Sequence, residues 1–189
     1  MKKGLLIILS GPSGVGKGTV RKRVFEDKDL NLVYSVSMTT RLPRRKEKPN
    51  VDYYFVDKEY FEENIKKGNF LEYCQFVGNY YGTPLDKVEE WRNQGKNVFL
   101  EIEINGASQV LQKCHGDDVI SIFLMPPSIE ALEQRIRRRK TETEEVIQER
   151  LKKARSEMPK HVDYGYVVIN DEIEHAAAEI ANIIKSKIN

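Results

Sequence analysis

The sequence predicts a single α/β domain in which a parallel β-sheet carries helices on both faces. Four short apolar runs are typical of buried parallel strands, and stretches with helical spacing separate them. A glycine-rich loop follows the first run, where α/β proteins often bind phosphates. Residues 35–85 interrupt this alternation, because strand-like pieces there surround one helix and predict an inserted, mixed β lobe. The apolar runs are 5–9, 98–102, 119–124 and 166–169.

Length and composition limit the classes of protein that fit. A chain of 189 residues is large enough for one hydrophobic core. Its net charge of +2 gives no reason to expect a nucleic-acid partner. Cys74 and Cys114 lack metal or redox spacing, which favours reduced packing residues of a cytoplasmic protein. No apolar run is long enough to span a membrane, so we expect a soluble protein without a membrane partner. No feature specifies an oligomeric state.

The glycine-rich loop has the composition of a phosphate-binding loop. It reads Gly11-Pro12-Ser13-Gly14-Val15-Gly16-Lys17-Gly18-Thr19 and precedes apolar residues at helical spacing. Backbone N–H groups and the positive end of a helix dipole converge in such a turn, and Lys17 adds a mobile charge for the β/γ-phosphates. The alternative is an ordinary glycine-rich turn.

The hydroxyl of the usual motif is displaced by one residue. Gly18 stands directly after the lysine, where Ser or Thr is usual, and Thr19 follows. Residue 18 therefore has no side chain to ligate Mg²⁺, and we expect the metal to be held mainly by phosphates and water.

Capping signals place the later helices and the internal boundaries. We expect one domain over 4–184, with its core in 1–34, 86–125 and 159–189, the inserted lobe in 35–85 and a helical excursion in 126–158. We expect one helix with its N-cap at Asn105 that ends near Gly116, and a second helix that begins at Ser128. A third helix runs from the capping box Thr141-x-x-Glu144 to about Met158, and a fourth from about 172 to 187.

Glu72 is the most informative residue of the inserted lobe. On a strand over 70–77 it shares a face with Phe70, Cys74 and Phe76, so a carboxylate lies in an apolar row. A buried carboxylate needs hydrogen-bond donors, and a guanine edge offers two parallel ones. The alternative is an edge-strand glutamate that faces solvent or pairs with a lysine.

Two further groups in the lobe suit a phosphate. Arg41 and Arg44 follow a short strand at 33–36 and form a fork beside a proline-stiffened turn, although a solvated basic loop has the same composition. Tyr80 and Tyr81 lie on a predicted tight turn, and tyrosine hydroxyls are good partners for phosphate or ribose. Thr83 follows them and is equally suited to be a helix N-cap.

Acidic and basic residues outside the lobe complete the candidates. Glu101 and Glu103 alternate with isoleucines where a buried strand ends, so both are expected to face one side of the ligand-binding sheet edge, unless the strand simply emerges into solvent. Arg135 and Arg139 lie on one helix face, and Arg150 comes one helix later. These cations fit a mobile lid over the phosphates during phosphoryl transfer. Such a transfer requires no covalent protein nucleophile. A nucleic-acid patch or simple compensation of the helix dipole are the alternatives.

Taken together, these segments resemble the bacterial guanylate kinases, which are P-loop nucleoside monophosphate kinases. The resemblance covers residues 4–184 and rests on LSGPSGVGKGT, YSVSMTTRLPR, DYYFV, FLEYCQFVGNYYGT, LEIEINGA, FLMPPS, TETEE and VIND. It implies a three-layer α/β/α core with a small lobe for the monophosphate and a helical lid. It also implies transfer of the γ-phosphoryl group of ATP to GMP, giving ADP and GDP, with Mg²⁺.

The resemblance also implies roles for individual residues. ATP phosphates would lie on Gly11 to Thr19 with Lys17 nearest the transferred group, and Asn170 would lie near the adenine. The GMP phosphate would be held by Arg41, Arg44, Tyr53 and Tyr81. The guanine would be surrounded by Ser37, Glu72, Thr83 and Glu103. The charge of the transition state would be neutralised by Arg135, Arg139 and Arg150. Two positions depart from the pattern of some relatives: Lys140 stands where relatives often have Gly, and Glu103 stands where some have a shorter acid.

Two other functions are compatible with the same fold and motifs. A non-catalytic scaffold of this fold uses the monophosphate site to bind a phosphorylated peptide, but such modules usually lack an intact phosphate loop. A kinase for another small phosphorylated acceptor would keep the loop and differ in the acceptor pocket. Glu72 with Ser37 favours guanine over that alternative.

Overall fold

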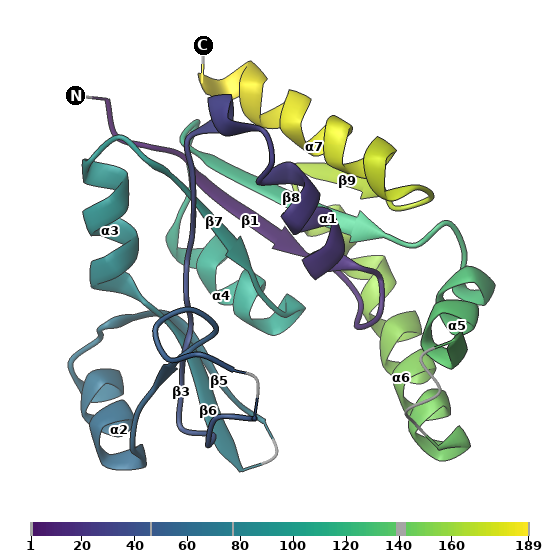
Figure 1. The fold of residues 1–189 in the computed structure, drawn as a ribbon, viewed down its shortest axis with the longest axis horizontal. Helices are drawn as coiled ribbons and strands as arrows, with labels where there is room; N and C mark the ends of the chain where they lie inside the picture. The colour runs from purple at the N-terminus through teal and green to yellow at the C-terminus, as the bar shows by residue number, and fades with distance from the viewer. Residues whose placement is uncertain (1, 46, 77, 139–142, 189) are drawn as a thin grey trace.

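The computed structural model describes residues 2–45, 47–76, 78–138 and 143–188, and it confirms the predicted α/β architecture (Figure 1). A five-stranded sheet with the order β2-β7-β1-β8-β9 forms the core, and all of its neighbouring strands are parallel. The four predicted apolar strands are all present in it. The strands are β1 (Leu6–Ser10), β2 (Leu32–Tyr34), β7 (Asn97–Glu101), β8 (Val119–Met125) and β9 (Tyr166–Ile169).

Helices cover both faces of this sheet because successive residues of β1 point to opposite sides. Ile7 and Leu9 belong to a buried cluster with α1 and α7, which lie next to each other (Figure 1). Leu6 and Ile8 belong to a second cluster with α3 and α4. Because both faces of β1 are buried, its position is fixed from two sides. The covering helices are α1 (Lys17–Val24), α3 (Leu85–Asn93), α4 (Ile104–Lys113) and α7 (Ile173–Ile188).

Residues between the core strands form a second, mixed sheet, as predicted. Its order is β4-β3-β6-β5, with β3 parallel to β4 and β6 antiparallel to β3 and β5. Phe61 of α2 is buried against it and stacks on Phe70 and Tyr80, with ring centroids 4.3 and 5.1 Å away. The elements are β3 (Met38–Thr39), β4 (Tyr54–Phe55), α2 (Lys58–Lys66), β5 (Phe70–Phe76) and β6 (Asn79–Pro84).

The predicted helical excursion has a small core of its own. Helix α5 (Ile129–Arg138) packs against α6 (Glu144–Glu157), which continues into the 3₁₀ helix η2 (Met158–Asp163). The Ala131 N–H donates to Ser128 Oγ at 3.0 Å, which confirms the predicted start. A further 3₁₀ helix, η1 (Lys28–Leu30), precedes β2. Among the described residues, no helix is long and apolar enough to cross a membrane.

Several predicted boundaries are wrong by a few residues. Helix α4 begins at Ile104 with Glu103 as its N-cap, so Asn105 lies inside the first turn. It ends at Lys113 rather than near Gly116, because Cys114 already has an extended backbone. Helix α6 has its N-cap at Thr143, and Thr141 of the predicted capping box lies outside the described residues.

The prediction that Phe70 and Glu72 share one face of the strand is also wrong. Strand β5 has a register shift between these residues, and such a bulge breaks the two-residue alternation. A side chain on Gly82 would collide with the Phe70 ring, whereas Thr83 contacts Glu72. Because neighbouring residues of β6 face opposite sides, Phe70 and Glu72 do so too. The bulge thereby turns Glu72 away from α2 and toward α4.

A buried asparagine fastens β7 to the start of β1. The side chain of Asn97 accepts a hydrogen bond from the Leu5 N–H at 2.9 Å and donates to the Leu30 carbonyl at 2.8 Å. Only 6% of Asn97 is exposed, so water cannot readily replace it at either backbone group.

We therefore predict that Asn97→Ala lowers the free energy of unfolding by about 2–4 kcal/mol, because two buried backbone groups lose their partner. Urea denaturation measures this difference. Asn93→Ala is the matched control, since Asn93 is exposed at the end of α3 and its replacement should cost almost nothing. Equal stabilities of the two variants would contradict the role assigned to Asn97.

Candidate active site

The loop between β1 and α1 has the backbone of a phosphate-binding turn. Gly16 is the N-cap of α1 with a φ of 102°, a region that favours glycine. Gly11 also has a positive φ, and a side chain there would collide with the carbonyl oxygen of Leu124 in β8. The first N–H groups of α1 lack partners within the helix, so they are available to an anion in front of the loop.

Lys17 lies folded against this loop. Its Nζ donates to the carbonyl oxygen of Gly11 at 2.6 Å and to that of Pro12 at 3.3 Å. Burial lowers the pKa of Lys17, and the nearby carboxylates of Glu103 and Glu101 act in the opposite direction. The ammonium group is therefore poorly hydrated and held at the loop by two carbonyl groups that a phosphate can replace.

A cavity of about 430 Å³ lies in front of the loop. Glu101 and Glu103 both line it, as predicted, although β7 ends at Glu101 and Glu103 caps α4. Glu101 pairs with Arg21 at 2.6 Å, which sequence reasoning missed even though Arg21 lies one turn after Lys17 on α1. The lining residues are Ser13, Gly14, Gly16, Lys17, Gly18, Thr19, Arg21, Lys22, Glu101, Glu103 and Arg150.

A second cavity, of about 420 Å³, lies along the other side of the loop and contains Asn170. The side-chain amide of this residue donates to the Val15 carbonyl at 2.7 Å, while its buried Oδ1 has no partner among the described residues. Arg135 lines the same cavity and donates to the carbonyl oxygens of Asn170 at 2.6 Å and Val15 at 3.2 Å. Arg135 thus joins α5 to the loop and to the end of β9.

The predicted lid cations reach the loop from both helices of the excursion. Arg150 of α6 donates to Ser13 Oγ at 2.8 Å. Lys153, one turn later, lies 3.5 Å from Glu103 and from Glu157. Arg139 and the family departure at Lys140 lie outside the described residues.

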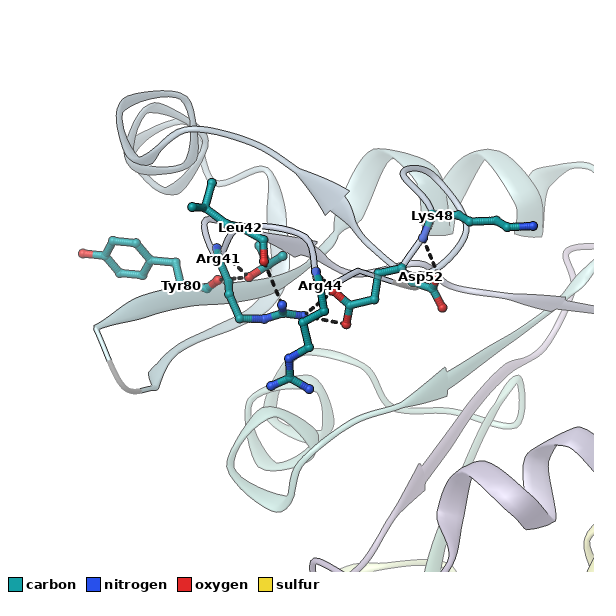
Figure 2. A network of polar contacts seen from close by, with 8 residues as sticks. Arg41, Leu42, Arg44, Lys48, Asp52 and Tyr80 are labelled. Carbon is teal, nitrogen blue, oxygen red and sulfur yellow. Dashed lines mark hydrogen bonds and ion pairs between the residues drawn. The ribbon is translucent and has the colours of Figure 1, made fainter. Parts of the chain in front are cut away.

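Arg41 of the mixed-sheet lobe is held by a carboxylate that sequence reasoning missed. Its guanidinium donates to both carboxylate oxygens of Glu47, at 2.8 and 3.0 Å, and to the Leu42 carbonyl at 2.8 Å (Figure 2). Glu47 also accepts from the Arg44 N–H at 2.8 Å. The pair raises the pKa of Arg41 and lowers that of Glu47. The Arg44 guanidinium extends away from this network (Figure 2).

Only one of the two predicted tyrosines joins Arg41. Tyr80 and Tyr81 lie on β6 rather than on a tight turn, so their side chains face opposite sides. Tyr80 stacks on Phe61, whereas the Tyr81 ring lies 6.1 Å from that of Tyr53. The guanidinium carbon of Arg41 lies 5.5 Å from the Tyr53 ring centroid. Arg41, Tyr53 and Tyr81 therefore form one group, as predicted.

Glu72 is buried, and the predicted burial of a carboxylate is confirmed. It is 5% exposed, and its Oε1 accepts a hydrogen bond from Thr83 Oγ1 at 2.6 Å. Burial raises the pKa of Glu72, while Thr83 and Lys113 act to lower it. Thr83 is not the N-cap of α3, because Pro84 has that position. The Thr83 hydroxyl donates its hydrogen bond to Glu72 instead. Ser37 accepts a backbone hydrogen bond from Tyr54 next to β3.

The first turn of α4 lies between the cavity of the phosphate loop and the Glu72 carboxylate. Glu103, the N-cap, lines the cavity in front of the loop, and Gly106 lies against the Glu72 carboxylate. Gly106 is a further residue that sequence reasoning missed, since its proximity depends on how α4 packs against β5. One helix turn therefore separates two clusters suited to a triphosphate and to a base with paired donors.

Comparisons with known proteins agree with this geometry. The guanylate kinase family model matches residues 3–187. A guanylate kinase of Listeria monocytogenes serotype 4b (strain F2365) is 50% identical over 186 residues, which are 98% of this chain and 90% of the relative. That of Oceanobacillus iheyensis is 52% identical over 186 residues, 98% of this chain and 89% of the relative. The crystal structure of guanylate kinase from Anaplasma phagocytophilum has a TM-score of 0.77 at 35% identity and covers 99% of this chain and 87% of that one. The chain therefore belongs to the guanylate kinase family.

Proposed function

We propose that the chain transfers the γ-phosphoryl group of ATP to GMP, giving ADP and GDP, as a nucleoside monophosphate kinase of purine nucleotide metabolism. The observation that carries this proposal is the buried pair of Glu72 and Thr83, which lies against the first turn of α4, the turn whose N-cap Glu103 lines the cavity of the phosphate loop. A carboxylate with so little exposure needs donors from a ligand as well as from Thr83.

The donor nucleotide occupies the loop. Its phosphates lie on the backbone of Gly11 to Thr19, and Lys17 exchanges its carbonyl partners for the β/γ-phosphate oxygens. The adenine lies in the cavity beside Asn170, whose unpartnered Oδ1 is suited to accept from an amino group.

The acceptor nucleotide occupies the lobe. Its phosphate is held by Arg41, Arg44, Tyr53 and Tyr81, three of which the structure groups together. Its base meets Ser37, Glu72, Thr83 and Glu103, and the Glu72 carboxylate accepts from the guanine ring N–H and amino group. Arg41 must then share its guanidinium between Glu47 and the incoming phosphate.

Catalysis rests on position and charge rather than on a protein nucleophile. Lys17, Arg135, Arg139 and Arg150 neutralise the charge that develops on the transferred group, with Arg41 on the acceptor side. Mg²⁺ suits the oxygen donors of this cavity, where Glu101 and Glu103 face the loop and Gly18 offers no hydroxyl. When bound, the ion would neutralise phosphate charge, and phosphate oxygens and water would hold it, with Glu101 and Glu103 as the carboxylates of the same cavity.

The arrangement of the chain suits closure around two substrates. We assign the core to 1–34, 86–125 and 159–189, the GMP-binding lobe to 35–85 and the lid to 126–158, within one domain over 4–184. We also assign a cytoplasmic location, which the free thiols of Cys74 and Cys114 support. The partners we propose are ATP and GMP, with neither nucleic acid nor membrane.

ATP consumption measured against GMP, AMP, CMP and UMP tests the proposed function. We expect turnover with GMP at a kcat/KM at least about 100-fold above that with AMP, because AMP leaves the buried Glu72 without matching donors. Preference for another phosphorylated acceptor would contradict the assignment. Binding of a phosphopeptide without any turnover would favour the scaffold alternative.

We predict that Lys17→Ala lowers kcat by about 1,000-fold or more, because a charge on the transferred phosphoryl group is lost. The fold should persist, since the hydrogen bonds of Lys17 in the described part of the chain go to carbonyl groups of its own loop. Steady-state kinetics and circular dichroism measure the two effects, with Lys66→Ala on the exposed face of α2 as the control. Near-normal turnover of the Lys17 variant would refute its role.

We predict that Glu72→Gln lowers kcat/KM for GMP by about 10- to 100-fold, because one guanine donor meets an amide instead of a carboxylate oxygen. Burial raises the pKa of Glu72, so this carboxylate becomes protonated at a higher pH than an ordinary glutamate. The unmodified protein should therefore lose GMP use as the pH falls and Glu72 is protonated, and the variant should not show this loss. The kcat/KM for GMP is measured from pH 5 to 8 for the unmodified protein, for Glu72→Gln and for Glu59→Gln, which is an exposed control. Identical pH profiles would contradict the assignment.

A further inference from the structure

Gly106 of α4 has no backbone reason to be glycine. It lies in the first turn of a regular helix without a positive φ, where alanine forms helix more readily. The residue is buried, and the space beside it is filled by the end of Glu72. A Cβ atom at Gly106 would lie 2.6 Å from Glu72 Oε2 and 3.1 Å from Cδ. Among the described residues, the three heavy atoms nearest to this Cβ position all belong to the Glu72 side chain, so the carboxylate is what requires glycine here.

We infer that Gly106 is a specificity-determining positioning residue, which leaves the room in which the Glu72 carboxylate faces the guanine. The inference rests on the proposed function, because it assigns Glu72 to the base. Gly106 itself touches no reacting atom and acts only through Glu72.

The surroundings of Glu72 leave its carboxylate little room to avoid a side chain at position 106. Oε1 is fixed by Thr83 Oγ1 at 2.6 Å, and only 5% of the residue is exposed. Ordinary contact with a Cβ begins at 3.4 Å, so a methyl group at 106 would push Oε2 away by about 0.8 Å (3.4 minus 2.6). Because Oε2 is the end of a side chain, the carboxylate moves more easily than the helix backbone. It then leaves the position that receives paired donors, so we expect the loss in GMP binding rather than in the transfer step.

The test introduces Gly106→Ala into the unmodified chain and into Glu72→Ala. In the unmodified chain we expect the KM for GMP to rise about 10- to 100-fold, with kcat and the KM for ATP changed less than about threefold. In the Glu72→Ala background the same substitution should change the KM for GMP less than about twofold, because the carboxylate is gone. Asn105→Ala is the control, since it also improves helix propensity but lies at an exposed position of the same turn.

Thermal unfolding keeps the test decisive if Gly106→Ala folds poorly. The clash requires Glu72, so Gly106→Ala combined with Glu72→Ala should unfold at or above the temperature of Glu72→Ala alone. An equal effect of Gly106→Ala in both backgrounds, on KM or on unfolding, would overturn the inference, as would an unchanged KM in the unmodified chain. Failure of the unmodified chain to use GMP would instead overturn the proposed function, and this inference with it.

Discussion

The parallel pairing of β1 with β7 and β8 is the constraint on which both halves of the site depend. It brings the carboxyl ends of these strands to one edge of the sheet. The phosphate loop leaves β1 at that edge, and Gly11 must be glycine because β8 lies against it. Glu101 ends β7 there, and only Ile102 and Glu103 separate it from the start of α4. The short connection leaves α4 little freedom, so its first turn reaches from the phosphate cavity to the Glu72 carboxylate.

The cations of the site share a second feature, which is that each donates a hydrogen bond to a protein oxygen. Lys17 donates to Gly11, Arg41 to Glu47 and Arg150 to Ser13. Each partner satisfies a charge that would otherwise be poorly hydrated, and each can be exchanged for a phosphate oxygen. Glu72 is the opposite case, a buried anion for which Thr83 supplies one donor.

The sequence predicts those parts of the fold and site that depend on local pattern. Strand β9 spans the predicted residues, and the phosphate loop follows from composition and spacing. The strand pattern alone leaves both a buried and a solvent-facing Glu72 open, and the structure buries it. Patterns with a fixed period cannot reveal an inserted residue, which is why the bulge in β5 reverses the predicted face of Phe70 relative to Glu72. The pairing of Arg41 with Glu47 and the approach of Gly106 to Glu72 arise from tertiary packing, for which neither residue type gives a local signal.

The most direct measurement is a crystal structure with GMP and a non-hydrolysable ATP analogue bound together. Our account predicts a triphosphate on the backbone amides between Gly11 and Thr19, and a guanine whose ring N–H and amino group both donate to Glu72, with that carboxylate still against Gly106. A triphosphate bound away from this loop, or a guanine that makes no contact with Glu72, would contradict it.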